Sequence, residues 1–430
     1  MNPSTTQKPS SSSAESAFHC SVLIDARKLG DGGIGVYLEN LIDSFLEFNQ
    51  THENAVGLTL LVTPEVFSAT TTKQNAVWQT LLRWSDRVQF VKEPSKKYSV
   101  QEYALLAFRH WKLVRAHDIF HSPHYTLPYF LARPSIVTIH DAIHVTNPET
   151  WYHKLIGRFL IRSAIRRAKH VITVSDSSRK ILGEIASSIE TPISVIPNAL
   201  RQGFEVVSKE TVNDFIRQNH LEGGYCVFVG TEKPHKGFME LLDAWAELKR
   251  FSRNEGSVMP TLVVIGGKFS YFAQRRVEEL GLSRYVKFQG EVSVRSLCLY
   301  YNGAKAVIVP SREEGFGLVG LEAMACGAPV VSTPVESLRE VCGESGWYAS
   351  NCSGTSICNT LIKVFSEEAE RKRKVIIGIE RAKMFSREFV ARKTLSVYRN
   401  ALGLELISPS EVEFERGKEP KVVNIEGGAR

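Results

Sequence analysis

One stretch of the sequence indicates the fold most directly, and it reads Glu314-Gly315-Phe316-Gly317-Leu318-Val319-Gly320-Leu321-Glu322. It follows an apolar, β-branched segment at 306–310 and opens a helical pattern that runs to about Cys326. Glycines let the backbone approach a ligand closely, and the exposed N–H groups of a starting helix attract phosphate. This order predicts a phosphate-binding loop at the carboxyl end of a buried parallel strand.

Glu322 is the most informative residue of that stretch, because it is the only charge between Gly315 and Thr333. If the helix begins near Gly317, Glu322 lies about 7.5 Å along its axis. A partly buried carboxylate without a local cation must find hydrogen-bond donors or cost several kcal/mol. A ribose diol offers two donors, and Glu314 would then lie near the other end of the same ligand. The alternative is an ordinary solvated helix charge.

A second strand-to-helix loop reads Gly230-Thr231-Glu232-Lys233-Pro234-His235-Lys236-Gly237. Lys236 stands just before a helix whose apolar face includes Leu241 and Trp245. A cation beside helix N–H groups is a good clamp for a diphosphate. Taken alone, a lysine in that position is more often a surface residue, so the interpretation depends on the neighbouring glutamate loop.

The third candidate loop, Gly30-Asp31-Gly32-Gly33-Ile34-Gly35-Val36-Tyr37, lies between the first predicted strand and the first helix. The third glycine of a dinucleotide fingerprint is missing, since Leu38 occupies its place. The pattern therefore favours a flexible glycine loop that faces a ligand-binding cleft at the end of the strand.

Histidines mark further positions at strand ends. His140 and Asp141 end a predicted strand and would point at the cleft, although a locally satisfied histidine fits this place nearly as well. His121 and His124 are weaker candidates, either for the acceptor side or for shaping a proline-rich loop.

Apolar strands alternate with helical patterns along the rest of the chain. Strands are predicted at 21–26, 58–63, 88–91, 118–121, 135–140, 170–175, 193–197, 226–230, 261–266, 286–289, 306–310 and 329–332. Helices are predicted at 36–48, 101–115, 151–169, 177–187, 237–250, 271–281, 294–303, 317–326 and 355–368. Continuous apolar strands between helices are typical of parallel sheets covered on both faces. The fold class is therefore α/β, with two Rossmann-like, doubly wound parallel-sheet domains that face a central cleft.

The predicted domain organisation follows from this pattern. We expect a disordered leader at 1–17, an acceptor-side domain at 18–200 and a nucleotide-sugar-binding domain at 201–385. A helix at 386–405 is expected to return to the N-terminal domain, and 406–430 to form a disordered tail. The hinge falls within 198–224, which contains Pro197-Asn198 at its start and Gly223-Gly224 near its end.

Composition narrows the function classes. The chain has 430 residues, of which 43% are hydrophobic and 23% charged, as in a globular protein of two to three domains. The net charge of +7 is spread along the chain, which does not favour nucleic acid as a partner. Seven cysteines without a C-x-x-C pair read as reduced core residues, and no apolar run is long enough to cross a bilayer. We expect a cytoplasmic protein.

In this order the loops resemble the GT-B glycosyltransferases, specifically glycosyltransferase family 4, over about residues 20–402. Glu314 and Glu322 match the E-x7-E motif within E-G-F-G-L-x-x-L-E-A-M-A-x-G-x-P-V. Four shorter segments also match, namely Gly33-Ile34-Gly35-Val36-Tyr37, Val-Thr-Ile-His140-Asp141, Val-Ile-Thr-Val-Ser175 and Val-Ile-Pro-Asn198. The resemblance implies a retaining, metal-independent transfer of a hexose from a nucleotide diphosphate sugar.

The resemblance also assigns roles to residues. It implies three catalytic residues: Glu314, His140 and Lys236. It implies that Glu322 binds the ribose, that Glu314 and the amides of Phe316, Gly317 and Leu318 hold the sugar and phosphate, and that His140 contacts the sugar. The implied donor-binding set is Gly33, Gly35, Thr231, Lys233, Lys236, Gly315, Phe316, Gly317, Leu318 and Glu322.

One departure concerns the diphosphate clamp. Many members place an arginine after the glycine that matches Gly230, where this chain has Thr231. A subset similar to mannosyltransferases has Val-Gly-Thr followed by Pro-Arg-Lys, which reads Pro234-His235-Lys236 here. Lys233 is the candidate replacement for the missing charge. That subset makes GDP-mannose the first donor candidate and UDP-sugars the second, with a glycan or lipid-linked acceptor.

No cofactor or metal is expected. The sequence has no D-x-D motif, and Lys236 with backbone dipoles would neutralise the leaving group instead. Three alternatives stay open, because fold alone does not decide function. They are a nucleotide-sugar epimerase, a sugar phosphorylase and a non-catalytic nucleotide-sugar-binding protein.

A basic helix suggests a place for the acceptor. Residues 151–169 contain no acid, and Lys154, Arg158, Arg162 and Arg166 recur every fourth residue. Like charges at that spacing destabilise an isolated helix, so anionic lipids on the inner membrane face are one predicted partner. A solvated outer face over a core-packed stripe is the equal alternative.

Overall fold

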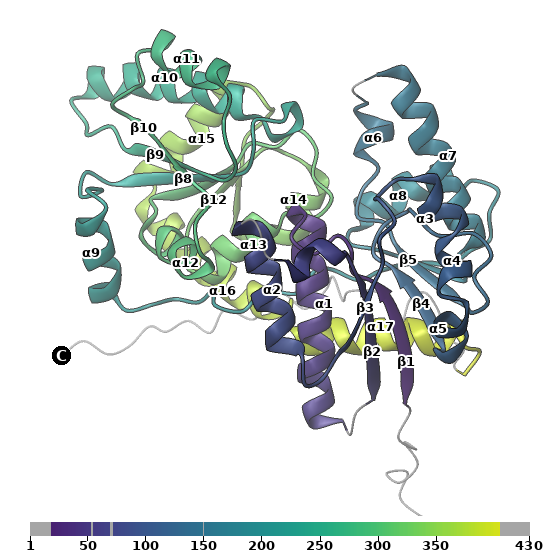
Figure 1. Cartoon of the computed structure of the whole chain (residues 1–430). Coiled ribbons are helices and arrows are strands. Elements are labelled where there is room, and N and C mark those ends of the chain that lie inside the picture. Colours follow the sequence, from purple (N-terminus) through teal and green to yellow (C-terminus); the bar gives the residue numbers. More distant parts are fainter. Residues whose placement is uncertain (1–18, 53–54, 69–71, 149, 405–430) are drawn as a thin grey trace, which may run out of the picture.

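The computed structural model describes residues 19–52, 55–68, 72–148 and 150–404, which form two α/β domains side by side (Figure 1). Each domain contains one parallel sheet, of seven and six strands respectively. The predicted fold class is confirmed. The leader and tail predicted at 1–17 and 406–430 lie outside the described residues.

The N-terminal sheet has the order β3-β2-β1-β4-β5-β6-β7, and all its neighbouring strands are parallel. Its strands are β1 (Cys20–Asp25), β2 (Val56–Val62), β3 (Gln89–Lys92), β4 (Ile119–Ser122), β5 (Ser135–Thr138), β6 (His170–Thr173) and β7 (Ile193–Val195). The strands between the edges are almost entirely buried, because helices cover both faces of the sheet. This explains why they read as continuous apolar runs.

The helical segments of this domain are α1 (Gly32–Thr51), η1 (Pro64–Phe67), α2 (Thr72–Trp84), α3 (Val100–Ala104), α4 (Leu106–Arg109), α5 (Trp111–Ala116), α6 (Ile143–Thr146), α7 (Trp151–Arg167) and α8 (Asp176–Ile185). The helix predicted at 101–115 is divided into α3, α4 and α5. The backbone N–H of Tyr129 donates to the carbonyl oxygen of Tyr103 at 2.8 Å, which takes that carbonyl out of the helical pattern.

The C-terminal sheet has the order β10-β9-β8-β11-β12-β13. Its strands are β8 (Tyr225–Val229), β9 (Thr261–Ile265), β10 (Val286–Gly290), β11 (Ala306–Val309), β12 (Val330–Ser332) and β13 (Gly346–Tyr348). The sequence analysis missed β13, a three-residue edge strand.

The C-terminal domain also contains α9 (Lys209–Gln218), η2 (Pro234–Lys236), α10 (Phe238–Glu255), α11 (Tyr271–Glu279), α12 (Val294–Gly303), α13 (Leu318–Ala325), α14 (Glu336–Cys342), η3 (Gly343–Ser345), α15 (Gly354–Ser366) and α16 (Glu368–Lys383). The last described helix, α17 (Arg387–Ala401), packs against α1 and, in the view of Figure 1, crosses behind the strands of the N-terminal sheet. Its apolar side belongs to the same buried cluster as β1 and α1.

The chain crosses between the domains twice, and the two crossings touch. The first follows β7, and the second joins α16 to α17. The backbone N–H of Leu200 donates to the carbonyl oxygen of Phe385 at 2.8 Å, and the Asn40 side-chain amide of α1 donates to the carbonyl oxygen of Ala199 at 3.1 Å. The two crossings are therefore adjacent chain segments held against α1.

Candidate active site

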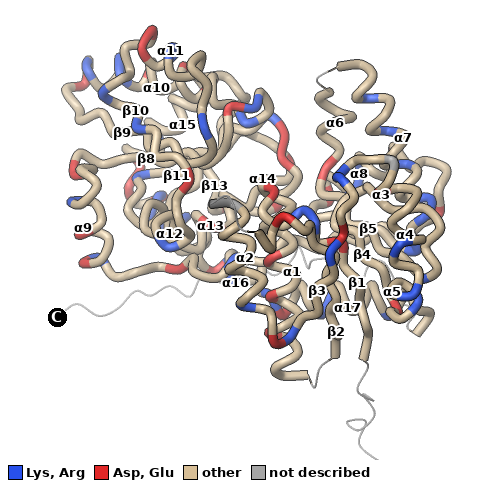
Figure 2. Tube along the Cα trace, in the orientation of Figure 1, with Lys and Arg blue, Asp and Glu red and all other residues tan. Residues whose placement is uncertain are grey.

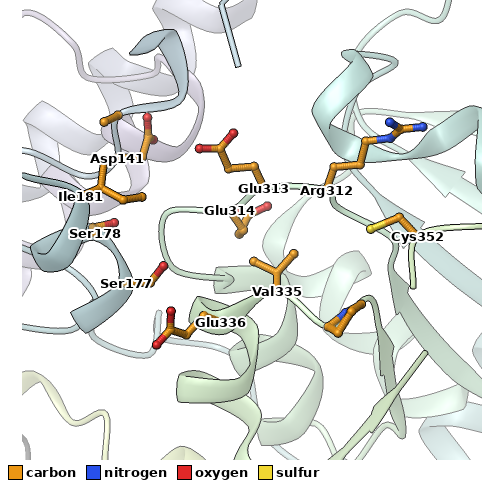
Figure 3. A pocket seen from close by; sticks show the side chains of 12 residues that line it. Asp141, Ser177, Ser178, Ile181, Arg312, Glu313, Glu314, Val335, Glu336 and Cys352 are labelled. Atoms are coloured by element: carbon orange, nitrogen blue, oxygen red, sulfur yellow. The ribbon is translucent and has the colours of Figure 1, made fainter. Parts of the chain in front are cut away.

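A cavity of about 360 Å³ lies between the two domains. Figure 3 shows its N-terminal wall on one side, made of Asp141, Ser177, Ser178 and Ile181, and its C-terminal wall on the other. The C-terminal wall includes Arg312, Glu313, Glu314, Val335, Glu336 and Cys352. Both walls are built at the carboxyl ends of parallel strands, where α/β sheets bind ligands.

The glutamate loop, residues 314–317, packs directly against the other domain. The Ser175 hydroxyl donates to the carbonyl oxygen of Gly315 at 2.8 Å. A Cβ atom on Gly315 would come within 2.8 Å of the carbonyl oxygen of His140 and 3.2 Å of the Asp141 Cβ. Only glycine fits here, so the loop reaches the His140–Asp141 strand end because it lacks a side chain.

The start of α13 leaves backbone donors open. Gly317 caps the helix with φ of +109°, a conformation that favours glycine. Within the described chain, no acceptor pairs with the N–H groups of Phe316 and Gly317. The Phe316 ring is buried against Phe385, with 5.8 Å between ring centroids, so its backbone, not its side chain, is available for binding. Open N–H groups before a helix suit an anionic oxygen.

Lys236 and Glu314, predicted from two separate loops, are in contact. Their Nζ and Oε2 atoms lie 2.7 Å apart, and the Ser311 hydroxyl donates to the same oxygen at 3.1 Å. Gly237 makes this approach possible, since its φ is +67° and an added Cβ would meet the Pro310 carbonyl oxygen at 1.9 Å. A cation and a carboxylate thus lie side by side next to the open amides of the glutamate loop.

Glu322 is buried, with 4% of its surface exposed, and it has protein partners. Its Oε1 lies 3.0 Å from an Arg201 guanidinium nitrogen, and the Tyr301 hydroxyl donates to Oε2 at 3.4 Å. The sequence shows no cation near Glu322, but the fold supplies one from the first crossing between the domains. Burial raises the pKa of the Glu322 carboxyl, while Arg201 and Tyr301 act in the opposite direction.

His140 is held in one orientation at the end of β5. Its Nε2 lies 3.0 Å from the Pro123 carbonyl oxygen and must donate, because a carbonyl only accepts. The Tyr37 ring of α1 meets the imidazole edge-on at 4.6 Å between centroids. Burial lowers the pKa of His140 to about 4, so the ring is neutral at pH 7 and Nδ1 remains an acceptor.

The two other histidine candidates differ from His140. His121 is fully buried and hydrogen-bonded at both ring nitrogens, to the Tyr398 and Thr138 hydroxyl groups at 2.7 and 2.8 Å. Its geometry is that of a core residue and not of an acceptor-binding one. His124 is also buried, and burial lowers its pKa well below the ordinary value.

Two acids that line the cavity, Glu313 and Glu336, were not identified from the sequence, whereas Asp141 was expected to point at the cleft. The Asp141 and Glu313 carboxyl groups point toward one another from opposite domains (Figure 3). Burial raises the pKa of both carboxyl groups, and the charge of Glu314 raises that of Asp141 further. No sequence pattern identifies Glu313, because its place beside Asp141 depends on how the two domains meet.

The glycine loop of the N-terminal domain is the first turn of α1, which begins at Gly32 and not at residue 36 as predicted. A Cβ on Gly33 would meet no atom within 4 Å, whereas a Cβ on Gly35 would lie 2.7 Å from the backbone nitrogen of Gly30. Gly33 is therefore open to a ligand, and Gly35 is needed for the turn itself.

Thr231 and Lys233 lie apart from the Lys236–Glu314 pair in the same loop, and both side chains are exposed. Lys233 lines a second cavity of about 560 Å³, together with Glu232, Phe272 and Arg312. Arg312 borders both cavities.

Three general properties concern the described residues as a set. They contain no group of three or more His, Cys, Asp and Glu side chains placed to hold a metal ion. None of their helices combines the length and apolarity needed to cross a membrane. All seven cysteines are free thiols, and all except Cys352 are buried.

Comparison with known proteins agrees with this geometry. Residues 32–201 match the family described as Glycosyltransferase Family 4, and residues 212–381 match Glycosyl transferases group 1. The chain is 30% identical to the O-antigen chain mannosyltransferase RfbU of Salmonella typhimurium over 53% of its length and 59% of that protein. It is 29% identical to O-antigen chain mannosyltransferase B of Escherichia coli over 70% of its length and 80% of that protein.

A solved structure shows the same architecture. HepE of Anabaena, in complex with UDP and glucose, superposes with a TM-score of 0.69 and 17% identity, covering 89% of this chain and 100% of that one. The chain matches two families, contains two parallel sheets and places the glutamate loop between them. Together these findings show that the chain belongs to the GT-B glycosyltransferases of group 1, family 4.

Proposed function

We propose that this protein transfers a hexose, with mannose as the first candidate, from a nucleotide diphosphate sugar to a glycan or lipid-linked acceptor, with retention and without a metal. One observation carries the proposal: the Lys236–Glu314 contact stands beside the open amides of the glutamate loop and faces His140 and Asp141. Cation, amides and carboxylates thus converge on one interdomain position. The similarity to two O-antigen chain mannosyltransferases supports mannose, and the UDP bound by HepE keeps UDP-sugars as the second candidate donor.

The residues divide the chemistry between the domains. The Lys236 ammonium and the amides of Phe316 and Gly317 stabilise the departing diphosphate. The acceptor hydroxyl attacks the anomeric carbon of the donor sugar from the same face from which the diphosphate departs. Its proton passes to a phosphate oxygen as the new C–O bond forms and the old one breaks. Neutral His140 uses Nδ1 to accept a hydrogen bond from a sugar hydroxyl and does not serve as an acid at pH 7.

A donor panel tests the proposal. Purified protein is mixed with GDP-mannose, GDP, UDP-glucose and UDP, and thermal stabilisation, nucleotide release and sugar products are measured. We expect stabilisation by one nucleotide family and release of its diphosphate only when an acceptor is present. Conversion of the donor without an acceptor would indicate an epimerase instead, and stabilisation without turnover a binding protein.

We also propose that α7 docks on an anionic membrane surface near the cavity. Its first turns expose the large apolar side chains of Trp151, Tyr152, Leu155, Ile156 and Phe159, here named the α7 patch. Helix α7 contains basic residues and no acidic ones (Figure 2). Aromatic and aliphatic groups beside basic ones suit a lipid headgroup boundary.

The contacts of α7 show which of its basic side chains are exposed for binding lipid phosphates. The Arg162 guanidinium donates to the Ile185 carbonyl oxygen at 2.8 Å and to the Ser188 hydroxyl at 2.6 Å, so it fastens α7 to the end of α8. Lys154, Arg158 and Arg166 are exposed and remain for lipid phosphates. The Thr146 hydroxyl of α6, next to α7, hydrogen-bonds Glu313 in the cavity, so a docked α7 would bring lipid close to the site.

Vesicle flotation tests this second proposal. We expect the protein to float with vesicles of phosphatidylcholine and phosphatidylglycerol, and Lys154→Glu/Arg158→Glu and Trp151→Ser/Phe159→Ser each to weaken flotation. Arg250→Glu/Arg253→Glu, two exposed arginines of α10, makes the same charge change elsewhere and should float like the wild type. Equal loss in the two charge-reversal variants would assign the effect to net charge, and absence of wild-type flotation would end the idea.

A further inference from the structure

Arg201 lies on the first crossing between the domains and contacts α13. It follows Ala199 and Leu200, which bind α1 and the second interdomain crossing, and its guanidinium reaches Glu322 of α13. The Arg201 side chain is 20% exposed and the Glu322 side chain 5%. The ion pair is thus largely removed from water, where each partner depends on the other.

The Glu322 carboxylate can accept hydrogen bonds beyond those that it makes to Arg201 and Tyr301. Two oxygens of an ionised carboxylate offer about four acceptor positions. Arg201 occupies one position on Oε1 and Tyr301 one on Oε2, which leaves one on each oxygen. Two remaining acceptors on neighbouring oxygens match the two donors of a vicinal diol.

We infer that Arg201 is a positioning residue, which keeps the buried Glu322 carboxylate ionised and oriented so that it can accept both hydroxyl groups of the donor's ribose. This inference rests on the proposed function, because it names the group that Glu322 receives. Arg201 acts through Glu322 and needs no contact with the ligand.

Among the groups around Glu322, Arg201 decides whether the Glu322 carboxylate stays ionised. The groups facing Glu322 are Arg201 from the interdomain crossing, Tyr301 from α12 and the Cys326 thiol at the end of α13. Arg201 also faces Glu39 of α1. Of these groups only Arg201 is a cation. Without it, only the Tyr301 hydrogen bond would oppose the effect of burial on the Glu322 carboxyl, and the protonated form of that carboxyl would be favoured at neutral pH.

The test compares nucleotide binding across pH in wild type, Arg201→Met and Arg201→Lys. Binding of GDP and UDP is measured by calorimetry from pH 6 to pH 9, with the 2′,3′-dideoxy nucleotides as controls that lack the diol. In Arg201→Met we expect affinity for the preferred ribonucleotide to fall by about tenfold at pH 6.5. It should recover as pH rises, because Glu322 then loses its proton. Arg201→Lys should restore a flat profile, and the dideoxy nucleotide should show no pH-dependent difference between variants.

Three outcomes would overturn the inference. They are a wild-type pH profile in Arg201→Met, an equal loss at every pH, and a pH-dependent loss that persists in Arg201→Met/Glu322→Gln. The equal loss would mean direct ligand contact or a general structural defect.

A ligand-free measurement separates this inference from the proposed function. Removing Arg201 raises the folded-state pKa of Glu322, so the stability difference between wild type and Arg201→Met should grow as pH rises from 5 to 8. If no variant binds any nucleotide but this difference appears, the ion pair acts as described and the proposed function fails. If nucleotides bind and neither pH effect appears, the inference alone fails.

Discussion

At the residue scale, the contact between Lys236 and Glu314 joins two loops that the sequence presents separately. The pair is only partly buried, with side-chain exposures of 28% and 18%. Water screens such a pair, so it contributes little to stability. Its position beside the open amides of Phe316 and Gly317 therefore favours the proposed catalytic role over a structural one.

Glu314→Ala separates these two contributions. We expect kcat/KM to fall by about a hundredfold or more, because a group that orients the transferred sugar is lost. The free energy of unfolding should change by only about 1 kcal/mol. Enzyme kinetics and urea unfolding on the same preparation make the comparison. Proportional loss of activity and stability would contradict the catalytic assignment.

Buried histidines make the N-terminal domain sensitive to acid. Burial lowers the pKa of His140 and of His170 to about 4. The unfolded chain takes up those protons near pH 6.5, so between about pH 6.5 and pH 4 the unfolded state binds more protons and stability falls. Each residue contributes on the order of 3 kcal/mol to this loss.

Urea unfolding at pH 7, 6 and 5 checks this expectation. His170→Gln should flatten the pH dependence, and the exposed His144→Gln should leave it as in the wild type. The same slope in all three proteins would show that other groups control acid unfolding.

The sequence revealed some of these residues and not others for a physical reason. Glycines and helix starts act through neighbouring backbone, so the glutamate loop and the Lys236 turn could be identified locally. The partners of Glu322 could not, because Arg201 and Tyr301 reach it only through tertiary packing. A charge-free neighbourhood in sequence did not mean a charge-free neighbourhood in space.

At the element scale, Gly33 and Gly35, two of the three glycines in the first turn of α1, have different constraints. Alanine at position 35 would press against the Gly30 backbone, while alanine at position 33 would enter open space. We expect Gly35→Ala to destabilise the fold by about 2–4 kcal/mol. Gly33→Ala should leave stability within about 1 kcal/mol of the wild type but raise the KM for the donor, because it blocks backbone approach.

Thermal melts and donor saturation curves distinguish the two variants. If Gly33→Ala binds donor as tightly as the wild type, the glycine loop does not approach the donor. A fully stable Gly35→Ala would mean that the turn relaxes at little cost.

Helices and strands could be predicted where the local pattern of apolar residues determines them. The central strands and most helices were recognised because their apolar runs are long. The helix predicted at 101–115 was wrong because a bond from Tyr129, distant in sequence, ends α3 early. The edge strand β13 has three residues, too few to show a pattern.

At the scale of the whole molecule, the Glu340 carboxylate is one of the groups that link the two domains. Glu340 of α14 accepts the backbone N–H groups of Asp176 and Ser177, at 2.7 and 2.8 Å, at the start of α8. A carboxylate that caps a helix of the other domain stabilises the observed arrangement of the domains, because charged hydrogen bonds of this kind contribute about 1.5–3 kcal/mol.

Glu340→Gln should shift the molecule toward an open arrangement. We expect kcat/KM to fall by about tenfold and the radius of gyration from X-ray scattering to rise, while secondary structure stays unchanged. Glu344→Gln, an exposed glutamate of the same domain, should behave as the wild type. An unchanged radius of gyration in Glu340→Gln would show that other contacts hold the domains together.

The return of α17 to α1 has a consequence during protein synthesis. The ribosome produces β1 and α1 first and α17 only after the whole C-terminal domain, yet Phe45 of α1 and Tyr398 of α17 share one core. The nascent N-terminal half must therefore wait, with the apolar side of α1 uncovered, until translation has passed residue 401. During that interval the uncovered side of α1 is the place where a chaperone would bind the growing chain.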